Sequence, residues 1–386
     1  MKKYILFGLF AIMMASCVDE YNANLGSADR NMLIVEGNIY SDSLCIFYLS
    51  HGVGLDENIW YEKDVLVDDA QVAVVGSDGS RFEGLRQRGG TYAVKTGVLS
   101  KDVKYGLEIL WDGATLSSEP TLPEYCSEIE KVRFYQKIDS ISPNQPVEVL
   151  VSVEETRSDK AEFYRWTYTE DWEVHTKYNP YYEYDPEKDK IVWLEFHKNR
   201  GWKTGKCQEI LVATNTKFQG NKVQDHRILS IENSNDRLQV LYRMDVKQYP
   251  MSKAQYEYEQ ARQEISDNMG GLFAPLPSVL NGNISSSDKN HRAIGYVGVC
   301  GNVATARLWI NRREITFNDE FSRRIQVLDD EELLEMSNFE LWKMNFRISY
   351  HDAMTGLTEW CPRSGVDATA LGATFDKPAG WDEYEY

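Results

Sequence analysis

The side chains that could carry out catalysis or bind a metal are dispersed along this sequence. Its six histidines stand singly, and none has another histidine two or four residues away. The sequence has no GxSxG elbow, no P-loop, no GxGxxG motif and no CxxC pair. Asp225-His226 is a weak hint of a general base, and a satisfied surface histidine explains it better. We therefore expect no enzyme activity, no cofactor and no metal site.

Cys17 carries the clearest chemical prediction. Two lysines follow the first methionine, an apolar stretch runs to Met14, and Ala15-Ser16 directly precedes Cys17. This layout predicts a signal peptide of residues 1–16. Its end resembles the lipobox of bacterial lipoproteins, in which the cysteine thiol receives a diacylglycerol and the new N-terminus is acylated. Burial of the acyl chains, at about 0.8 kcal/mol per CH₂, would make the attachment essentially permanent. An ordinary signal peptide with an unrelated cysteine is the alternative.

The residues behind Cys17 bear on where the protein is displayed. Residues 17–31 are expected to form a lipidated tether, and Asp19 and Glu20 lie at its start. In Bacteroidota, acidic residues at this place resemble the signal that sends lipoproteins to the cell surface, whereas a solvated tether is the alternative. No later stretch approaches 18 consecutive apolar residues, so the lipid is the expected anchor. We expect a lipid-anchored, surface-exposed protein of the outer membrane.

The remaining cysteines suit an exported protein without defining disulfides. They form an odd set, so at least one stays unpaired. One disulfide is expected within the three in the second half of the chain. The five residues are Cys45, Cys126, Cys207, Cys300 and Cys361.

Aromatic side chains crowd the stretch between residues 166 and 202. Tyr181, Tyr182 and Tyr184 fall in a segment whose Asn179-Pro180 pair indicates a loop. Aromatic rings on a loop, together with Trp202, are candidates for binding a glycan or a peptide. The alternative is that such rings fill the core. The core is the preferred interpretation for Trp166, Trp172 and Trp193.

The elements that must position these residues are mainly strands. Residues 32–119 contain short apolar runs separated by turns such as Ser77–Ser80 and Asp112-Gly113, and they predict an immunoglobulin-like β-sandwich. Pro120 and Pro123 interrupt any ladder and mark a domain boundary.

Residues 124–386 predict a larger β-rich domain with one or two helices. Strands over residues 163–168 and 172–176 are expected to pair across a turn at residues 169–171. A helix is predicted over residues 252–268, because Ser252 and Gln255 form a capping box and Gly270-Gly271 follows.

Composition excludes one class of partner. The chain has 386 residues, with 42 basic and 60 acidic side chains and a formal charge of −18. Nucleic-acid binding requires a basic surface, so we expect no nucleic-acid partner. The ordinary hydrophobic content of 42% predicts a folded chain.

Several motifs along the chain together resemble a known family. Besides the lipobox cysteine they are Ile34–Ile39, Gly90–Tyr92, Phe163–Trp166, Gln248–Ser252, Leu272–Pro277, Gly282–Ile284 and Ile294–Val297. In order and spacing they resemble a Bacteroidota lipoprotein family catalogued as a domain of unknown function (four-two-four-nine). Gln208 departs from the family, which often has Trp there, and Lys377–Trp381 is a loosened version of a C-terminal Pro-aromatic motif.

The resemblance implies an outer-membrane lipoprotein typically encoded beside a TonB-dependent transporter of the SusC type. It supplies no catalytic residues. We therefore expect a ligand-binding or accessory subunit of a nutrient-uptake system, whose ligand could be a glycan, a peptide or a metal chelate. A structural or adhesive surface lipoprotein is the first alternative. A hydrolase of surface polymers with an unrecognised site is the second.

Overall fold

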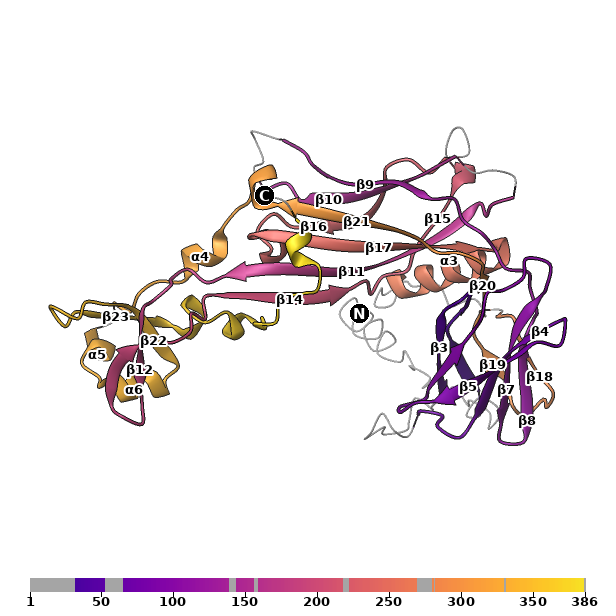
Figure 1. Ribbon diagram of the computed structural model, residues 1–386, viewed down its shortest axis with the longest axis horizontal. Helices are drawn as coiled ribbons and strands as arrows, with labels where there is room; N and C mark the ends of the chain where they lie inside the picture. The colour runs from indigo at the N-terminus through magenta and orange to yellow at the C-terminus, as the bar shows by residue number, and fades with distance from the viewer. Residues whose placement is uncertain are drawn as a thin grey trace, which may run out of the picture.

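The computed structural model describes residues 32–52, 65–138, 144–155, 159–217, 222–268, 280, 282–329 and 331–384. The fold is mainly β, as predicted from the sequence. The signal peptide, Cys17, the tether and the Leu272–Pro277 motif lie outside the described residues. Along the longest axis of the molecule lie a β-sandwich, a pair of central sheets and a small lobe, in that order (Figure 1).

The sandwich is one nine-stranded sheet that folds over on itself. β5 joins its two halves, because its first residues pair with β4 and its last residues pair with β6. With β18 (Ile284–Ser286) and β19 (Ala293–Ile294) from later in the chain, the strand order is β18-β8-β7-β4-β5-β6-β3-β1-β19. Buried side chains such as Phe47, Val74 and Leu107 fill the space between the halves. The N-terminal strands are β1 (Leu33–Glu36), β3 (Leu44–His51), β4 (Gln71–Gly76), β5 (Arg81–Arg86), β6 (Thr91–Lys95), β7 (Tyr105–Trp111) and β8 (Ala114–Ser118).

Both predicted hairpin turns of the sandwich are present. Asp112 and Gly113 have positive φ between β7 and β8, which is the backbone geometry of a type I′ turn. Between β4 and β5, Asp78 accepts a hydrogen bond from the Ser80 amide at 3.0 Å. Local turn chemistry therefore determines these two connections.

The chain returns to the sandwich far along the sequence. β19 (Ala293–Ile294) pairs with β1, and β18 (Ile284–Ser286) pairs with β8, so the late strands form both edges of the sheet. β20 (Val299–Cys300) pairs in parallel with β2 (Ile39–Tyr40). Residues 284–300 belong to the segment assigned from the sequence to the second domain, yet they complete the first.

Two sheets enclose the core of the central part. A five-stranded sheet has the order β14-β11-β17-β21, with β15 also on β11, and a three-stranded sheet has the order β16-β10-β9. Trp166, Tyr242 and Val149 are among the buried side chains between them. The strands are β9 (Ile129–Gln136), β10 (Val147–Val153), β11 (Phe163–His175), β14 (Arg200–Lys206), β15 (Leu211–Thr214), β16 (His226–Ile231), β17 (Leu241–Met251) and β21 (Ala304–Asn311).

β11 is one continuous strand, so the turn predicted at residues 169–171 is wrong. The polar residues there have partners from other parts of the chain. Glu170 is buried and accepts a hydrogen bond from the Tyr242 hydroxyl at 2.7 Å. Asp171 accepts one from Arg243 at 2.6 Å. Because both carboxylates have hydrogen-bond donors, they can be accommodated within the sheet, and the strand continues through residues 169–171.

The long helix α3 (Lys253–Asn268) confirms the predicted helix. Ser252 Oγ accepts a hydrogen bond from the Gln255 amide at 3.2 Å, as an N-cap does. The Gln255 side chain does not complete the predicted capping box. It donates instead to Asn38 Oδ1 at 2.9 Å and thereby connects the helix to the sandwich.

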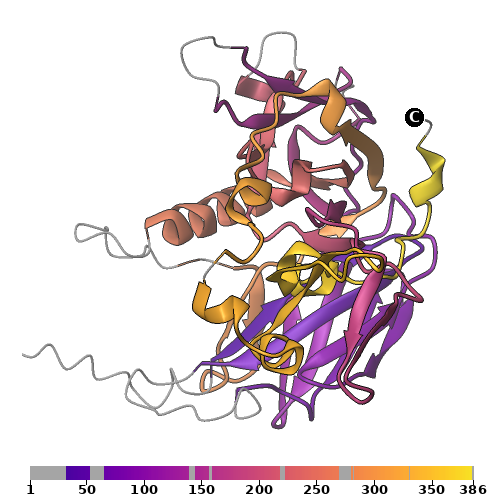
Figure 2. The same ribbon diagram turned by 90° about the vertical axis from the view of Figure 1, so that its left-hand side faces the viewer.

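The end of the molecule opposite the sandwich is a small lobe, here called the distal lobe, of residues 178–199 and 325–365 (Figures 1 and 2). α4 (Glu320–Arg324) leads into it. Its own core contains Tyr184, Leu341, Ile348 and Trp360. Its elements are β12 (Tyr182–Asp185), β13 (Lys190–Trp193), α5 (Glu331–Leu334), α6 (Asn338–Lys343), β22 (Phe346–His351) and β23 (Thr358–Pro362).

The predicted disulfide within the second half of the chain is wrong. Cys207, Cys300 and Cys361 are all free thiols, as are the two earlier cysteines of the described chain. Cys300 lies between the sandwich and β17, with its thiol 3.6 Å from the Pro250 carbonyl oxygen, whereas Cys361 is in β23 of the distal lobe. Burial raises the pKa of the Cys361 thiol to about 12. Among the described helices, none has the length and apolarity needed to cross a bilayer.

Candidate functional site

The predicted tyrosines lie on and beside the β12–β13 hairpin of the distal lobe. Tyr182 pairs with Trp193 across the hairpin, and their rings meet edge to face with centroids 5.1 Å apart. Tyr181 is 57% exposed and Trp193 is 61% exposed. Their ring centroids are 5.7 Å apart. The ring of His351 packs edge-on against Tyr182 at 5.0 Å. Tyr181, Tyr182 and Trp193 therefore form one aromatic surface.

Two of the predicted binding residues are buried instead. Tyr184 is 4% exposed and belongs to the core of the distal lobe, where its hydroxyl donates to Asp189 at 2.6 Å. That hydrogen bond raises the pKa of Tyr184 to about 12. Trp202 is 8% exposed and packs with Leu241 and Trp381. Neither ring has a face available to a ligand.

Of the three tryptophans that were expected in the core, two are buried there and one is exposed. Trp166 and Trp172 are in the main core, as predicted. Trp193 was expected in the core and is exposed, because it is the last residue of a two-stranded hairpin. The alternation of apolar residues along a strand does not show whether another part of the chain covers the apolar face. The exposure of Trp193 is therefore the site feature that the sequence did not reveal.

The aromatic surface is part of a wider gathering of apolar side chains on the distal lobe. Of the nineteen large hydrophobic residues that are exposed in the described part of the chain, nine lie in this lobe. Met354 is 96% exposed and Leu357 is 57% exposed, both in the β22–β23 connection. The other members are Tyr181, Trp193, Phe196, Met336, Phe339, Met344 and Tyr350. Of these nine residues, Tyr181, Trp193 and Phe196 lie in the aromatic-rich segment that the sequence indicated, and the other six lie in the later part of the lobe.

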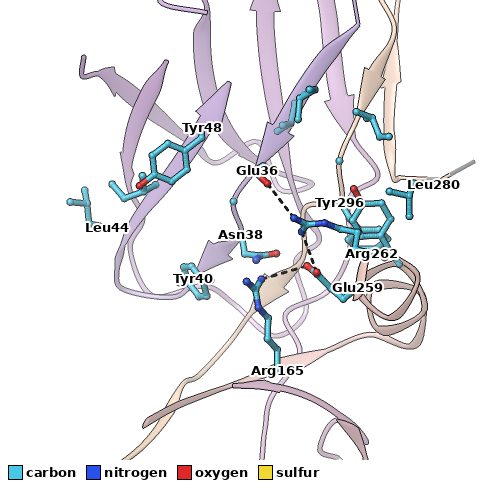
Figure 3. Close-up of a pocket in the computed structure, with 17 residues that line it drawn as sticks. Glu36, Asn38, Tyr40, Leu44, Tyr48, Arg165, Glu259, Arg262, Leu280 and Tyr296 are labelled. Atoms are coloured by element: carbon cyan, nitrogen blue, oxygen red, sulfur yellow. Dashed lines mark hydrogen bonds and ion pairs between the residues drawn. The ribbon is translucent and has the colours of Figure 1, made fainter. Parts of the chain in front are cut away.

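A second candidate is a pocket of about 610 Å³ between the sandwich and α3 (Figure 3). One wall is the outward face of β3, which presents Leu44, Ile46 and Tyr48. The opposite wall presents Arg165 from β11 with Glu259 and Arg262 from α3. The pocket is thus apolar on one side and charged on the other.

Four charged side chains form a chain of ion pairs along the charged wall (Figure 3). Arg262 contacts Glu36 at 3.3 Å and Glu259 at 3.2 Å, so it joins β1 to α3. Arg165 Nη1 lies 3.5 Å from Glu259 Oε1. Glu259 itself is only 3% exposed. The carboxylate of Glu259 is therefore shared by two guanidinium groups at the base of the pocket.

Backbone geometry brings the sandwich close to α3 beneath this pocket. Asn38 Oδ1 accepts hydrogen bonds from Gln255 Nε2 and from the Gly298 amide, each at 2.9 Å. A Cβ on residue 298 would lie 2.1 Å from Gln255 Oε1, so a larger residue there would displace the Gln255 amide from Asn38. Three segments that are distant in the sequence meet at Asn38.

The weak acid–base hint at Asp225-His226 does not form a catalytic pair. Asp225 accepts two hydrogen bonds from Arg133, each at 2.8 Å. The His226 ring stacks on Trp166 with centroids 5.2 Å apart, and its burial lowers its pKa. Among the described residues, no group of three or more His, Cys, Asp and Glu side chains could hold a metal ion.

Comparison with known proteins identifies a family, and two of the solved structures that the chain resembles are described here. A family model described as a domain of unknown function (DUF4249) matches residues 18–306. No curated protein matches the chain. A DUF4785 family protein from Legionella pneumophila is 11% identical, with a TM-score of 0.17. The match covers 56% of this chain and 52% of that one. A two-domain fibronectin type-III segment of chicken tenascin is 9% identical, with a TM-score of 0.15, and the match covers 55% of this chain and 88% of that one. The chain spans about half the length of the Legionella protein.

Proposed function

The chain belongs to the DUF4249 family, and on this premise we propose that it is an accessory subunit of a TonB-dependent nutrient-uptake system. In this proposal the acylated Cys17 anchors the protein in the outer membrane, exposed at the cell surface. The distal lobe then docks onto the transporter. The lipobox sequence ending at Cys17 and the acidic residues after it support the anchoring and the display.

The observation that carries the docking role is the set of exposed apolar side chains on the distal lobe. Soluble proteins seldom expose large apolar patches unless the patch binds something. Aromatic and methionine side chains are enriched at the centres of protein interfaces. The distal lobe exposes both kinds, including Trp193, Tyr350 and Met354. A protein partner therefore suits this surface.

The charge of the distal lobe argues against a membrane surface as its target. Its sequence contains thirteen Asp and Glu residues and six Lys and Arg residues. Anionic lipid headgroups attract basic segments, so an acidic lobe would be repelled by them. A protein surface that is neutral or basic where the lobe docks is the compatible partner.

Affinity capture of the native lipoprotein from detergent-solubilised outer membranes tests this role. We expect a TonB-dependent barrel to be recovered in stoichiometric amount. The double variant Met354→Glu/Leu357→Glu should lose the barrel, because it places charges in the apolar surface. Leu85→Glu is the matched control, since Leu85 is 70% exposed on β5 of the sandwich and should retain the barrel.

Two results would contradict the proposal. One is recovery of the lipoprotein alone under detergents that keep other outer-membrane complexes intact. The other is undiminished recovery of the barrel with the double variant. The first result would favour a structural or adhesive role without transport, and the second would place the contact elsewhere on the molecule.

A further inference from the structure

The apolar wall of the pocket between the sandwich and α3 follows from strand alternation in β3. Cys45, Phe47 and Leu49 point into the core of the sandwich and are fully buried. The alternate side chains Leu44, Ile46 and Tyr48 point outward, where a solvated sheet face would carry polar groups. Leu44 is 56% exposed and Tyr48 is 53% exposed, although both line the pocket. This wall therefore offers apolar surface that the described chain does not cover.

Arg165 on the opposite wall has unused hydrogen-bonding capacity. A guanidinium group has five N–H donors. In the described part of the chain, Arg165 Nε is buried and has no hydrogen-bond partner. Among the described residues, Nη1 contacts Glu259 at 3.5 Å, which is at the limit of a hydrogen bond. A buried, unpaired donor of a charged group lowers the stability of the folded protein. A ligand that supplies an acceptor to Arg165 would remove this cost.

The space beside Arg165 can hold such an acceptor. Arg165 lines both the main pocket and a recess of about 70 Å³ behind it. Tyr40, Tyr249 and Gln255 also line this recess. A small polar head group could therefore reach the guanidinium while the rest of the molecule stayed in the larger cavity.

The balance of charge limits what kind of anion can bind. Two arginines and two glutamates line the pocket, and Arg262 contacts both Glu36 and Glu259. Arg165 is thus the cation with a weak partner, and Glu259 lies next to it. A polyanion would be repelled by the two carboxylates. A single negative charge directed at Arg165 would not.

We propose that this pocket binds a small monocarboxylate with an apolar body. The carboxylate pairs with Arg165, and the apolar body lies along Leu44, Ile46 and Tyr48. Pockets at domain interfaces that combine apolar walls with a few polar groups are the usual sites for small ligands. The pocket lies at the sandwich end of the molecule, away from the distal lobe, so it does not depend on the docking role (Figure 1).

Calorimetric titration of the native lipoprotein in a non-ionic detergent tests the proposal. The probes are N-acetylphenylalanine, its neutral amide, and octanoate. We expect the carboxylate probes to bind and the amide to bind at least about tenfold more weakly, because charge-assisted hydrogen bonds contribute more than neutral ones. The stronger of the two carboxylates distinguishes a peptide-like ligand from an aliphatic one.

Two variants distinguish the contribution of the charged wall to binding from that of the apolar wall. Arg165→Gln should weaken carboxylate binding by about tenfold or more and leave the weak binding of the amide unchanged. Tyr48→Ser should weaken the binding of every probe. Arg133→Gln is the matched control, because Arg133 is a paired arginine on β9 that does not line the pocket.

Equal binding of the acid and its amide would overturn the proposal, as would unchanged carboxylate binding by Arg165→Gln. Tyr48→Ser keeps the test decisive if Arg165→Gln fails to fold, since Tyr48 is half exposed. Capture of the transporter by the Arg165→Gln protein is a separate measurement. Failure to capture the transporter would therefore not affect the conclusion about the pocket, and absence of carboxylate binding would not affect the conclusion about docking.

Discussion

Trp166 and Trp193 show how differently two tryptophans of one aromatic-rich segment can contribute. Trp166 is fully buried and donates a hydrogen bond from its ring nitrogen to Gln248 Oε1 at 2.9 Å. Trp193 is 61% exposed. We predict that Trp166→Ala lowers the free energy of unfolding by about 3–5 kcal/mol, because it leaves a large cavity. Trp193→Ala should change it by no more than about 0.5 kcal/mol.

Urea unfolding followed by circular dichroism measures both changes. The two substitutions remove the same atoms, so each serves as the control for the other. A large loss of stability in Trp193→Ala would mean that the β12–β13 hairpin is covered in solution. Such a result would also remove the exposed ring on which the aromatic surface depends.

The buried Glu170 depends on two partners from elsewhere in the chain. Tyr242 donates to Glu170 Oε2 at 2.7 Å, and Arg237 lies 3.0 Å from Oε1. Burial and the adjacent carboxylate raise the pKa of Tyr242, which keeps its hydroxyl protonated and able to donate. We predict that Tyr242→Phe lowers the free energy of unfolding by about 2 kcal/mol, because the carboxylate loses a donor inside the core.

Denaturant titration near neutral pH measures this loss. Tyr135→Phe provides the control, since Tyr135 is 48% exposed on β9. If the two variants have the same stability, Glu170 does not rely on the Tyr242 hydroxyl.

Among the elements, those governed by local chemistry could be predicted from the sequence. The Asp112-Gly113 turn and the Ser252 cap of α3 involve residues within a few positions of one another. β11 could not be predicted as one strand, because the partners of Glu170 and Asp171 lie 72 residues away. The same reason applies to the candidate site. Tyr181 was identified by its loop setting, whereas the pocket requires Glu36, Arg165 and Glu259 to meet across three segments.

The late edge strands are held by a histidine between two carboxylates. His291 lies 3.0 Å from Asp112, in the β7–β8 turn, and 3.0 Å from Asp288. These hydrogen bonds, first that with Asp112, raise the pKa of His291. A raised pKa means that the stabilisation is complete below the unfolded-state value of about 6.5 and is lost as the pH rises through the folded-state value.

We therefore predict that the β18–β19 segment loosens as the pH rises above about 6.5. Hydrogen exchange of the amides in residues 284–294, corrected for the intrinsic effect of pH, measures this change. His291→Gln should remove most of the pH dependence while leaving exchange in the central sheets unaltered. An unchanged pH dependence in His291→Gln would show that another group is responsible.

At the scale of the whole molecule, the sandwich is built from two separated parts of the chain. β18 and β19 cover the two edges of its sheet, and β20 pairs with β2. Uncovered edge strands expose backbone donors and acceptors and promote association. We predict that residues 32–119 alone are less stable than the same region in the full chain and that they self-associate.

Size-exclusion chromatography and thermal unfolding of the fragment test this prediction. As the control, a second fragment carries residues 282–301 joined to residues 32–119 through a flexible linker, and we expect it to be monomeric. A stable, monomeric fragment without the added segment would contradict the structural role assigned to the late strands.

The return of residues 284–300 also sets the order in which the protein can mature. A polypeptide emerges from the ribosome, or from a membrane channel, beginning at its N-terminus. The sandwich starts at Leu33, but its sheet gains β18 and β19 only after about 250 further residues have emerged. The first module of this chain to be delivered is thus among the last to be finished. Until then it is an open sheet, and a chaperone that shields such edges has a defined interval in which to act.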